Sequence, residues 1–300
     1  MRLVSCVSYR IATHVETAKH TMKYIFIDGS YFIFFRFNAL KNWWSLARRD
    51  EGELVPTENE EFQEKFRKTF AEKLKEIPKK LGIKKGEPYR VYVGQDCRQE
   101  KIWRMEHYAV YKDGRPDTSN EGYFFKIVYG EQLFEKTLGD SCVLSYPTLE
   151  ADDVIAISAT HICESNPDDE CFIVSSDGDY LQLSGEPRIH IYDLKFKNVK
   201  SRDPAYSQPD TSAKMFVIKR LCGDKSDNIP SAFAKCGKKT AMAIADLANG
   251  NDDILFAELM WRGGQKAVNQ YKHNDMLMNF QCIPTDLREG FLALNTAKFN

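Results

Sequence analysis

Acidic residues recur in this chain where short apolar segments end, a pattern that could build a metal site. The apolar segments are 24–27, 90–93, 142–146 and 171–176, and a carboxylate follows each of them within four residues. Because the carboxyl ends of parallel strands meet at one edge of a sheet, we expect these side chains to lie close together. They are Asp28, Asp96, Glu150, Asp152, Asp153, Asp177 and Asp179.

This group of carboxylates favours a divalent cation. Negative charges that are crowded together raise one another's pKa values unless a cation neutralises them. Oxygen ligands without a Cys or His cluster favour Mg²⁺ or Mn²⁺. A single aspartate after a strand is more often a turn or helix-cap residue, and Glu150 and Asp153 could merely complement a helix dipole. The recurrence at four places is what favours a metal site.

The hydrophobic pattern predicts strands that alternate with helices. The four apolar segments have the length and composition of buried strands. Apolar residues recur every four positions over 60–77, which predicts an amphipathic helix. Further helices are expected over 121–136 and from Glu150. This alternation is typical of an α/β fold with a mainly parallel central sheet and helices on both faces.

Composition narrows the class of protein. The 300 residues suffice for one large domain, or for a core with a smaller appendage. The 42 basic and 43 acidic residues give a net charge of −1, which by itself points to no partner. We expect no membrane-spanning segment, because no apolar run approaches about 18 residues. The eight cysteines form no C-x-x-C pair, which disfavours a zinc module and favours reduced thiols in a cytoplasmic protein.

Four ordered motifs carry a resemblance to a known family. They are IFIDGS (25–30), LEADDVIA (149–156), SSDGDYLQL (175–183) and GDKSDNIPS (223–231). In order and spacing they resemble the acidic motifs of the 5′ nucleases of the flap-endonuclease superfamily. The segment WRMEHYAVYKDGR (103–115), which follows Asp96, resembles the basic, aromatic arch of the bacteriophage ribonuclease H and 5′-3′ exonuclease branch. The resemblance extends over residues 22–290.

The resemblance implies a Mg²⁺-dependent, structure-specific 5′-3′ nuclease with exonuclease, flap-endonuclease and ribonuclease H activity. Such an enzyme removes RNA primers or 5′ flaps in DNA replication and repair. Two Mg²⁺ ions, for which Mn²⁺ could substitute, would hold the scissile phosphodiester, one activating a water and the other stabilising the leaving oxygen. The implied ligands are Asp28, Asp96, Glu150, Asp152 and Asp177 in a first tier, Asp179, Asp224 and Asp227 in a second, and Asp153 as an accessory or outer residue. Catalytic roles are implied for all first-tier residues and, in addition, for Asp179, Lys112 and Arg104.

The resemblance also implies that the arch contacts nucleic acid. Arg104, Tyr108, Lys112 and Arg115 would hold the 5′ strand, with the tyrosine stacked on a base. If these residues formed one helix, Arg104, Tyr108 and Lys112 would share one of its faces. The alternative is a solvated face with one aromatic residue packed beneath it.

A helix-hairpin-helix element is implied over 223–241. Lys235, Gly237, Lys238 and Lys239 would grip the backbone phosphates of duplex DNA beside a helix N-terminus. A K⁺ ion held by the hairpin carbonyls is also implied. The stretch that ends at Gly237 is one residue longer than the family pattern and lacks two of its glycines, which allow close backbone approach. Without the flanking motif, such a charge run is most often a solvated face.

Three regions are predicted: an N-terminal extension at 1–21, an α/β nuclease core at 22–210 with the arch at 98–122, and a helical C-terminal region with the hairpin at 211–300. The extension could be a transit peptide, a disordered tail, or sequence upstream of a start at Met22. The predicted partner is DNA with a 5′ end, a 5′ flap or an RNA–DNA hybrid, bound by a monomer. No motif for a sliding clamp or a single-strand binding protein is visible. A phage-encoded chain would work in the host cytoplasm.

Two alternatives belong to other functional classes. A PIN-type ribonuclease acting on single-stranded RNA shares the acidic sheet edge but would lack the arch and the hairpin. A catalytically silent nucleic-acid-binding scaffold would be expected to lack a metal carboxylate, and the four motifs lack none. A D-x-D phosphatase is disfavoured, because Asp28-Gly29-Ser30 has no second aspartate.

Overall fold

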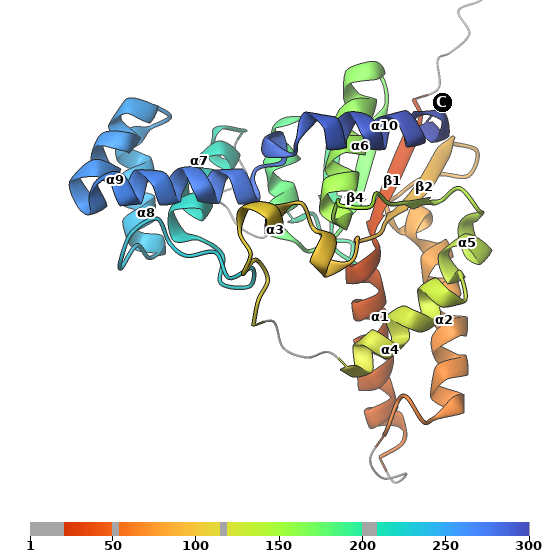
Figure 1. Cartoon of the computed structure of the whole chain (residues 1–300). Helices are drawn as coiled ribbons and strands as arrows, with labels where there is room; N and C mark the ends of the chain where they lie inside the picture. The colour runs from red at the N-terminus through yellow and green to blue at the C-terminus, as the bar shows by residue number, and fades with distance from the viewer. Residues whose placement is uncertain (1–20, 50–53, 115–118, 200–208, 300) are drawn as a thin grey trace, which may run out of the picture.

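A parallel β-sheet lies at the centre of the molecule. The computed structural model, drawn in Figure 1, describes residues 21–49, 54–114, 119–199 and 209–299. Within these ranges the strand order is β3-β2-β1-β4-β5, and every neighbouring pair is parallel. The strands are β1 (Lys23–Asp28), β2 (Tyr89–Gly94), β3 (Val143–Leu144), β4 (Glu170–Val174) and β5 (Ile189–Tyr192). The predicted α/β fold is confirmed, and β5 is an addition to the four predicted strands.

The register of the sheet brings its acidic strand ends to one edge. Ile27 of β1 pairs with Val93 of β2 and with Val174 of β4, so the three strands end level with one another. Side chains along β1 alternate between the two faces, with Ile25 and Ile27 in one apolar cluster and their neighbours in the other. The four middle residues of this central strand are therefore buried between the two layers of helices, and its end residues, Lys23 and Asp28, are partly exposed.

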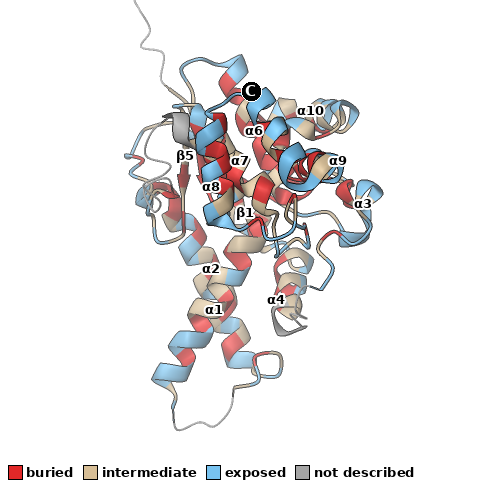
Figure 2. Ribbon diagram, turned by 90° about the vertical axis from the view of Figure 1, so that its left-hand side faces the viewer, coloured by how far each residue is buried: buried red, intermediate tan, exposed pale blue. Residues whose placement is uncertain are grey.

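Helices cover both faces of the sheet (Figure 1). On the face of Ile25 pack α1 (Gly29–Ala47), α2 (Glu60–Lys80), α4 (Ser119–Gly130) and α5 (Leu133–Leu138). On the other face pack α6 (Ala151–Ser165) and α10 (Thr285–Phe299). The predicted amphipathic helix over 60–77 is confirmed as α2, whose four predicted apolar positions are fully buried. In both views α1 and α2 run side by side and extend beyond the sheet (Figure 2).

The helix predicted over 121–136 is instead two helices, α4 and α5. Glycine has low helix propensity, and α4 ends at Gly130. Gln132 follows in the left-handed region with φ of +54°. This break lets Phe134 turn into the core, where its ring lies 5.1 Å from that of Phe70.

The arch segment also differs from the single helix considered for it. It contains a 3-10 turn, η1 (Gln99–Lys101), and one short helix, α3 (Arg104–His107). Tyr108 leaves the helix in an extended conformation, and Lys112 has a φ of +58°. Arg104 is buried at the start of α3 while the later residues turn back across the surface, so the three side chains do not share a helix face.

The C-terminal region is helical. It contains α7 (Pro209–Cys222), α8 (Lys238–Ala248) and α9 (Asp252–Met278), which share an apolar cluster of their own. The last helix, α10, returns to the α/β core and packs on α6, as Figure 1 shows. Among the residues described, no helix is both long and apolar enough to cross a bilayer.

Candidate active site

Four of the predicted first-tier carboxylates line one cavity at the carboxyl edge of the sheet. The cavity has a volume of about 280 Å³. Asp28 ends β1, Asp96 follows β2, Asp152 lies in the first turn of α6 and Asp177 follows β4. Lys112 of the arch also lines it. The structure thus brings together residues that are up to 149 positions apart in sequence, as the strand ends predict.

Asp28 is held at the floor of this site. Its carboxylate caps α1 by accepting a hydrogen bond from the Tyr31 amide at 3.0 Å. The Ser175 hydroxyl donates to the same carboxylate at 3.2 Å. Burial, together with the negative charges of Asp96 and Asp177, raises the pKa of Asp28 to about 7. A divalent cation in the cavity would offset that repulsion.

Asp96 ties the end of β2 to the start of α6. One of its carboxylate oxygens accepts a hydrogen bond from the Ala151 amide at 2.9 Å, and the other contacts the Ser30 hydroxyl. Gly94 permits this approach, because a Cβ there would lie 2.8 Å from the Ala151 carbonyl oxygen. The short distance between β2 and α6 places Asp96 and Asp152 on the same cavity.

Arg104 and Asp153 occupy a buried position beneath the cavity. The Arg104 guanidinium lies 2.7 and 2.8 Å from the two Asp153 oxygens and 2.7 Å from Glu150, and it donates to the Leu277 carbonyl. Trp103 donates a further hydrogen bond to Asp153 at 3.0 Å. Arg104 is only 2% exposed, which fits a structural role, and its contact with DNA stays a prediction. Asp153, with both oxygens engaged, fits the outer position rather than that of a direct ligand.

Glu150 contacts the arch beside the carboxylate-lined cavity. The Lys112 ammonium contacts one Glu150 oxygen, and the Tyr111 hydroxyl lies 3.3 Å from the other. The same hydroxyl donates to Asp227 at 3.1 Å. Candidate ligand oxygens of Glu150, Asp152 and Asp153 lie within 4.8 Å of one another. Burial and the charges of Asp153 and Glu150 raise the pKa of Asp152 well above its usual value. This oxygen-rich donor set fits a hard divalent cation.

The predicted second tier is divided in the structure. Asp179 and Asp224 are joined by Lys219, whose ammonium contacts Asp179 and lies 3.1 Å from Asp224. Burial and the charge of Asp177 raise the pKa of Asp179 to about 6, against the opposing effect of Lys219. Asp227 instead accepts a hydrogen bond from the Tyr111 hydroxyl. No sequence motif predicts a role for Lys219, because its contact with Asp179 spans 40 positions.

The hairpin residues lie on the surface at the start of α8. Gly237 is the N-cap, and Lys238 and Lys239 form the first turn, all exposed. Lys235 is also exposed and has a φ of +64°. Tyr108 of the arch donates a hydrogen bond to the Asn228 carbonyl at 2.9 Å, so its hydroxyl faces this region of the chain. Arg115 lies outside the described residues.

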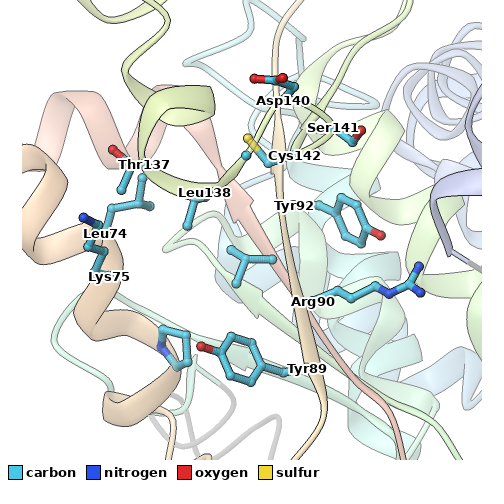
Figure 3. A pocket seen from close by; sticks show the side chains of 13 residues that line it. Leu74, Lys75, Tyr89, Arg90, Tyr92, Thr137, Leu138, Asp140, Ser141 and Cys142 are labelled. Atoms are coloured by element: carbon cyan, nitrogen blue, oxygen red, sulfur yellow. The ribbon is translucent and has the colours of Figure 1, made fainter.

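A different hollow, of about 620 Å³, opens beside the first half of β2 (Figure 3). Tyr89 and Arg90 of β2 lie on one side of it, and Thr137 and Leu138 of α5 on another. Asp140 is the single carboxylate in its lining. With one carboxylate, this hollow lacks the oxygen ligands of a metal centre. It also lies toward the amino end of β2, away from the acidic edge of the sheet.

The family model for the 5′-3′ exonuclease N-terminal resolvase-like domain matches residues 23–215. DNA polymerase I of a Synechocystis species is 32% identical over an alignment of 199 positions that covers 55% of this chain and 19% of that protein. Ribonuclease H of phage T4 is 26% identical over an alignment of 225 positions that covers 66% of each chain. The chain thus spans about a fifth of the polymerase relative and two thirds of the phage enzyme.

The fold also matches a solved structure. The D15 flap endonuclease of bacteriophage T5, crystallised with DNA and metal ions, superposes with a TM-score of 0.60 at 15% identity. The match covers 92% of this chain and 98% of that one. At this identity the comparison shows a shared fold across the core and the C-terminal helices.

Proposed function

The chain belongs to the 5′-3′ exonuclease family, and we propose that it is a divalent-metal-dependent, structure-specific 5′ nuclease. Its substrates would be DNA with a 5′ end, 5′ flaps and RNA–DNA hybrids. Its task would be the removal of RNA primers or flaps in replication and repair. The enzyme would act as a monomer.

One observation carries this proposal. Asp28, Asp96, Asp152 and Asp177 come from four separate segments and meet on one cavity that is open enough to admit a phosphate group. The site contains no paired nucleophile and base of the serine or cysteine type, since its lining is carboxylates, hydroxyls and one lysine. Such a lining suits phosphodiester hydrolysis by metal-activated water.

The donor set supports Mg²⁺, with Mn²⁺ as a substitute. Carboxylate oxygens are the ligands that these hard ions prefer. We propose that one ion is held by the first-tier residues and a second by Asp179, Asp224 and Asp227. Bound ions would activate the attacking water and stabilise the leaving oxygen. Asp153 and Arg104 would hold Glu150 and the start of α6 in place.

Two surfaces support nucleic-acid binding. Lys112 reaches the cavity from the arch, where it could place a phosphate against the ions. Lys235, Lys238 and Lys239 surround the N-terminus of α8, where exposed amides and positive charge favour backbone phosphates. A K⁺ ion at the hairpin remains part of the proposal. The T5 enzyme with this fold was crystallised with DNA, which agrees with such a surface.

The test is cleavage of end-labelled 5′-flap, nicked and RNA–DNA hybrid substrates with Mg²⁺ or with EDTA. We expect Mg²⁺-dependent products from 5′-ended duplexes, and loss of cleavage without loss of binding in Asp177→Asn. Asp140→Asn, an exposed acid in the other hollow, is the matched control. Cleavage of single-stranded RNA alone would favour the PIN-type ribonuclease. Binding without cleavage by the wild-type chain would favour the silent scaffold.

A further inference from the structure

Lys219 places a positive charge between two second-tier carboxylates. It lies in the last turn of α7, and its ammonium contacts Asp179 and lies 3.1 Å from Asp224. The Lys219 ammonium thus occupies the position where a second divalent ion would need the same oxygens.

The backbone around this contact is fixed. Gly223 links α7 to Asp224 with a φ of +72°, and a Cβ there would lie 2.3 Å from the Ile229 carbonyl oxygen. The Asp224 amide donates to that carbonyl oxygen at 2.9 Å, and the Ile229 amide donates back at 2.7 Å. These bonds hold the backbone of Asp224 next to the end of α7. The movable part is the four-carbon stem of Lys219, whose side chain is 26% exposed.

We propose that Lys219 is an internal counter-cation, which neutralises Asp179 and Asp224 until a second divalent ion displaces its ammonium and takes those oxygens. This inference rests on the proposed nuclease function, because it assumes an ion at the second tier. Lys219 then sets the affinity of that ion: part of the binding free energy is used to break an existing ion pair. The metal-free protein in turn avoids a cluster of unpaired carboxylates.

A purely structural ion pair would behave differently. If Lys219 stayed on Asp179 in the metal-bound protein, its removal would cost the same stability with and without Mg²⁺. If Lys219 competes with the ion, removal costs stability only without metal, and the second ion binds more tightly. Metal binding and folding are thermodynamically linked. A substitution that tightens binding of the second ion must therefore also increase the stabilisation that the metal gives to the folded protein.

The experiment uses the full chain, stripped of metal, at pH 8. Free Mn²⁺ is followed by electron paramagnetic resonance as it is titrated into wild type, Lys219→Met and Lys214→Met. Lys214 is the control because it lies on the same helix but pairs with Asp246. Thermal unfolding of each variant is measured in EDTA and in saturating Mg²⁺. Lys219→Arg, which keeps the charge, provides a second variant if Lys219→Met does not fold.

We expect two Mn²⁺ sites in wild type and a weaker site that tightens about tenfold or more in Lys219→Met, a change of about 1.4 kcal/mol. The stronger site, both sites of Lys214→Met and those of Lys219→Arg should stay within about threefold of wild type. Lys219→Met should melt below wild type in EDTA and close to it in Mg²⁺. Unchanged or weaker binding at the second site, or a single site in wild type, would overturn the inference. Tightened Mn²⁺ binding without cleavage of any 5′-ended substrate would overturn only the proposed nuclease function.

Discussion

Arg104 and Asp153 form a buried ion pair in which two guanidinium nitrogens lie 2.7 and 2.8 Å from the two carboxylate oxygens. Neither residue is more than 2% exposed. The pair stands at the first turn of α6, directly behind Asp152, and it also contacts Glu150. It therefore connects the stability of the core with the position of the metal carboxylates.

Removing one partner of this pair should be costly. We expect Arg104→Met to lower the free energy of unfolding by about 3–5 kcal/mol, because it leaves the Asp153 charge buried and unpaired. Urea denaturation in EDTA measures the change. Arg262→Met, which removes an exposed pair with Glu258 at 3.0 Å, should cost less than about 1 kcal/mol. If both variants lost the same free energy of unfolding, the buried pair would contribute no more to stability than the exposed one.

Metal affinity should depend on pH near neutrality. Burial and the charge of Asp96 raise the pKa of Asp28 to about 7, so this carboxyl is protonated in the metal-free protein below that pH. A divalent ion must displace the proton, and its apparent affinity should fall by up to about tenfold per pH unit as the pH drops below 7. Mg²⁺ titration calorimetry between pH 5.5 and 8.5 tests this. Asp28→Asn should weaken this pH dependence without abolishing it, because the pKa values of Asp152 and Asp179 are also raised.

The same pKa shift predicts how the stability of the metal-free protein changes with pH. The pKa of Asp28 rises from 3.8 to about 7 on folding, so between these values the folded chain binds more protons than the unfolded chain. The contribution of Asp28 to stability is therefore present at low pH and is lost as the pH rises through 7. In EDTA, wild type should lose more stability than Asp28→Asn from pH 5 to pH 7. An identical pH profile for the two proteins would contradict the raised pKa.

The hairpin prediction separates binding from chemistry. Replacing Lys238 and Lys239 with Ala should weaken binding to duplex-containing substrates and lower the salt slope of log K by up to about two. Turnover at saturating substrate should change little, since these residues lie away from the metal cavity. Fluorescence anisotropy at several salt concentrations measures the slope. Were the slope unaltered, the phosphate contacts would have to lie elsewhere.

The positions of the strand-end carboxylates could be predicted from the sequence for a simple physical reason. A buried strand can present a polar side chain only where it leaves the sheet, and parallel strands leave at one edge. Asp28, Asp96 and Asp177 follow from this rule alone. Their placement needs no knowledge of the loops or helices between the strands.

Arg104 and Lys219 show what the sequence could not reveal. Arg104 lies in a basic, aromatic stretch that is typical of a surface, yet its partners are 49 and 173 positions away. Lys219 reaches across 40 positions to Asp179. Contacts of this range depend on how the helices pack, and no local pattern encodes them. Periodicity likewise did not reveal the break between α4 and α5, which lies at Gly130 and the left-handed Gln132.

Lys112 offers the sharpest test of the arch. Its ammonium contacts Glu150 and lines the metal cavity, and its backbone is held over the site by a hydrogen bond from its amide to the Asp227 carbonyl at 3.0 Å. A cation in this place would act on the scissile phosphate in the transition state more than on the rest of the DNA. We therefore expect Lys112→Ala to lower the single-turnover cleavage rate by about tenfold or more while changing the Kd by less than about threefold. Lys101→Ala, an exposed lysine in the same segment, should change neither. Equal losses of rate and affinity would make Lys112 a general DNA contact, and no loss in either would leave it as a structural ion-pair partner of Glu150.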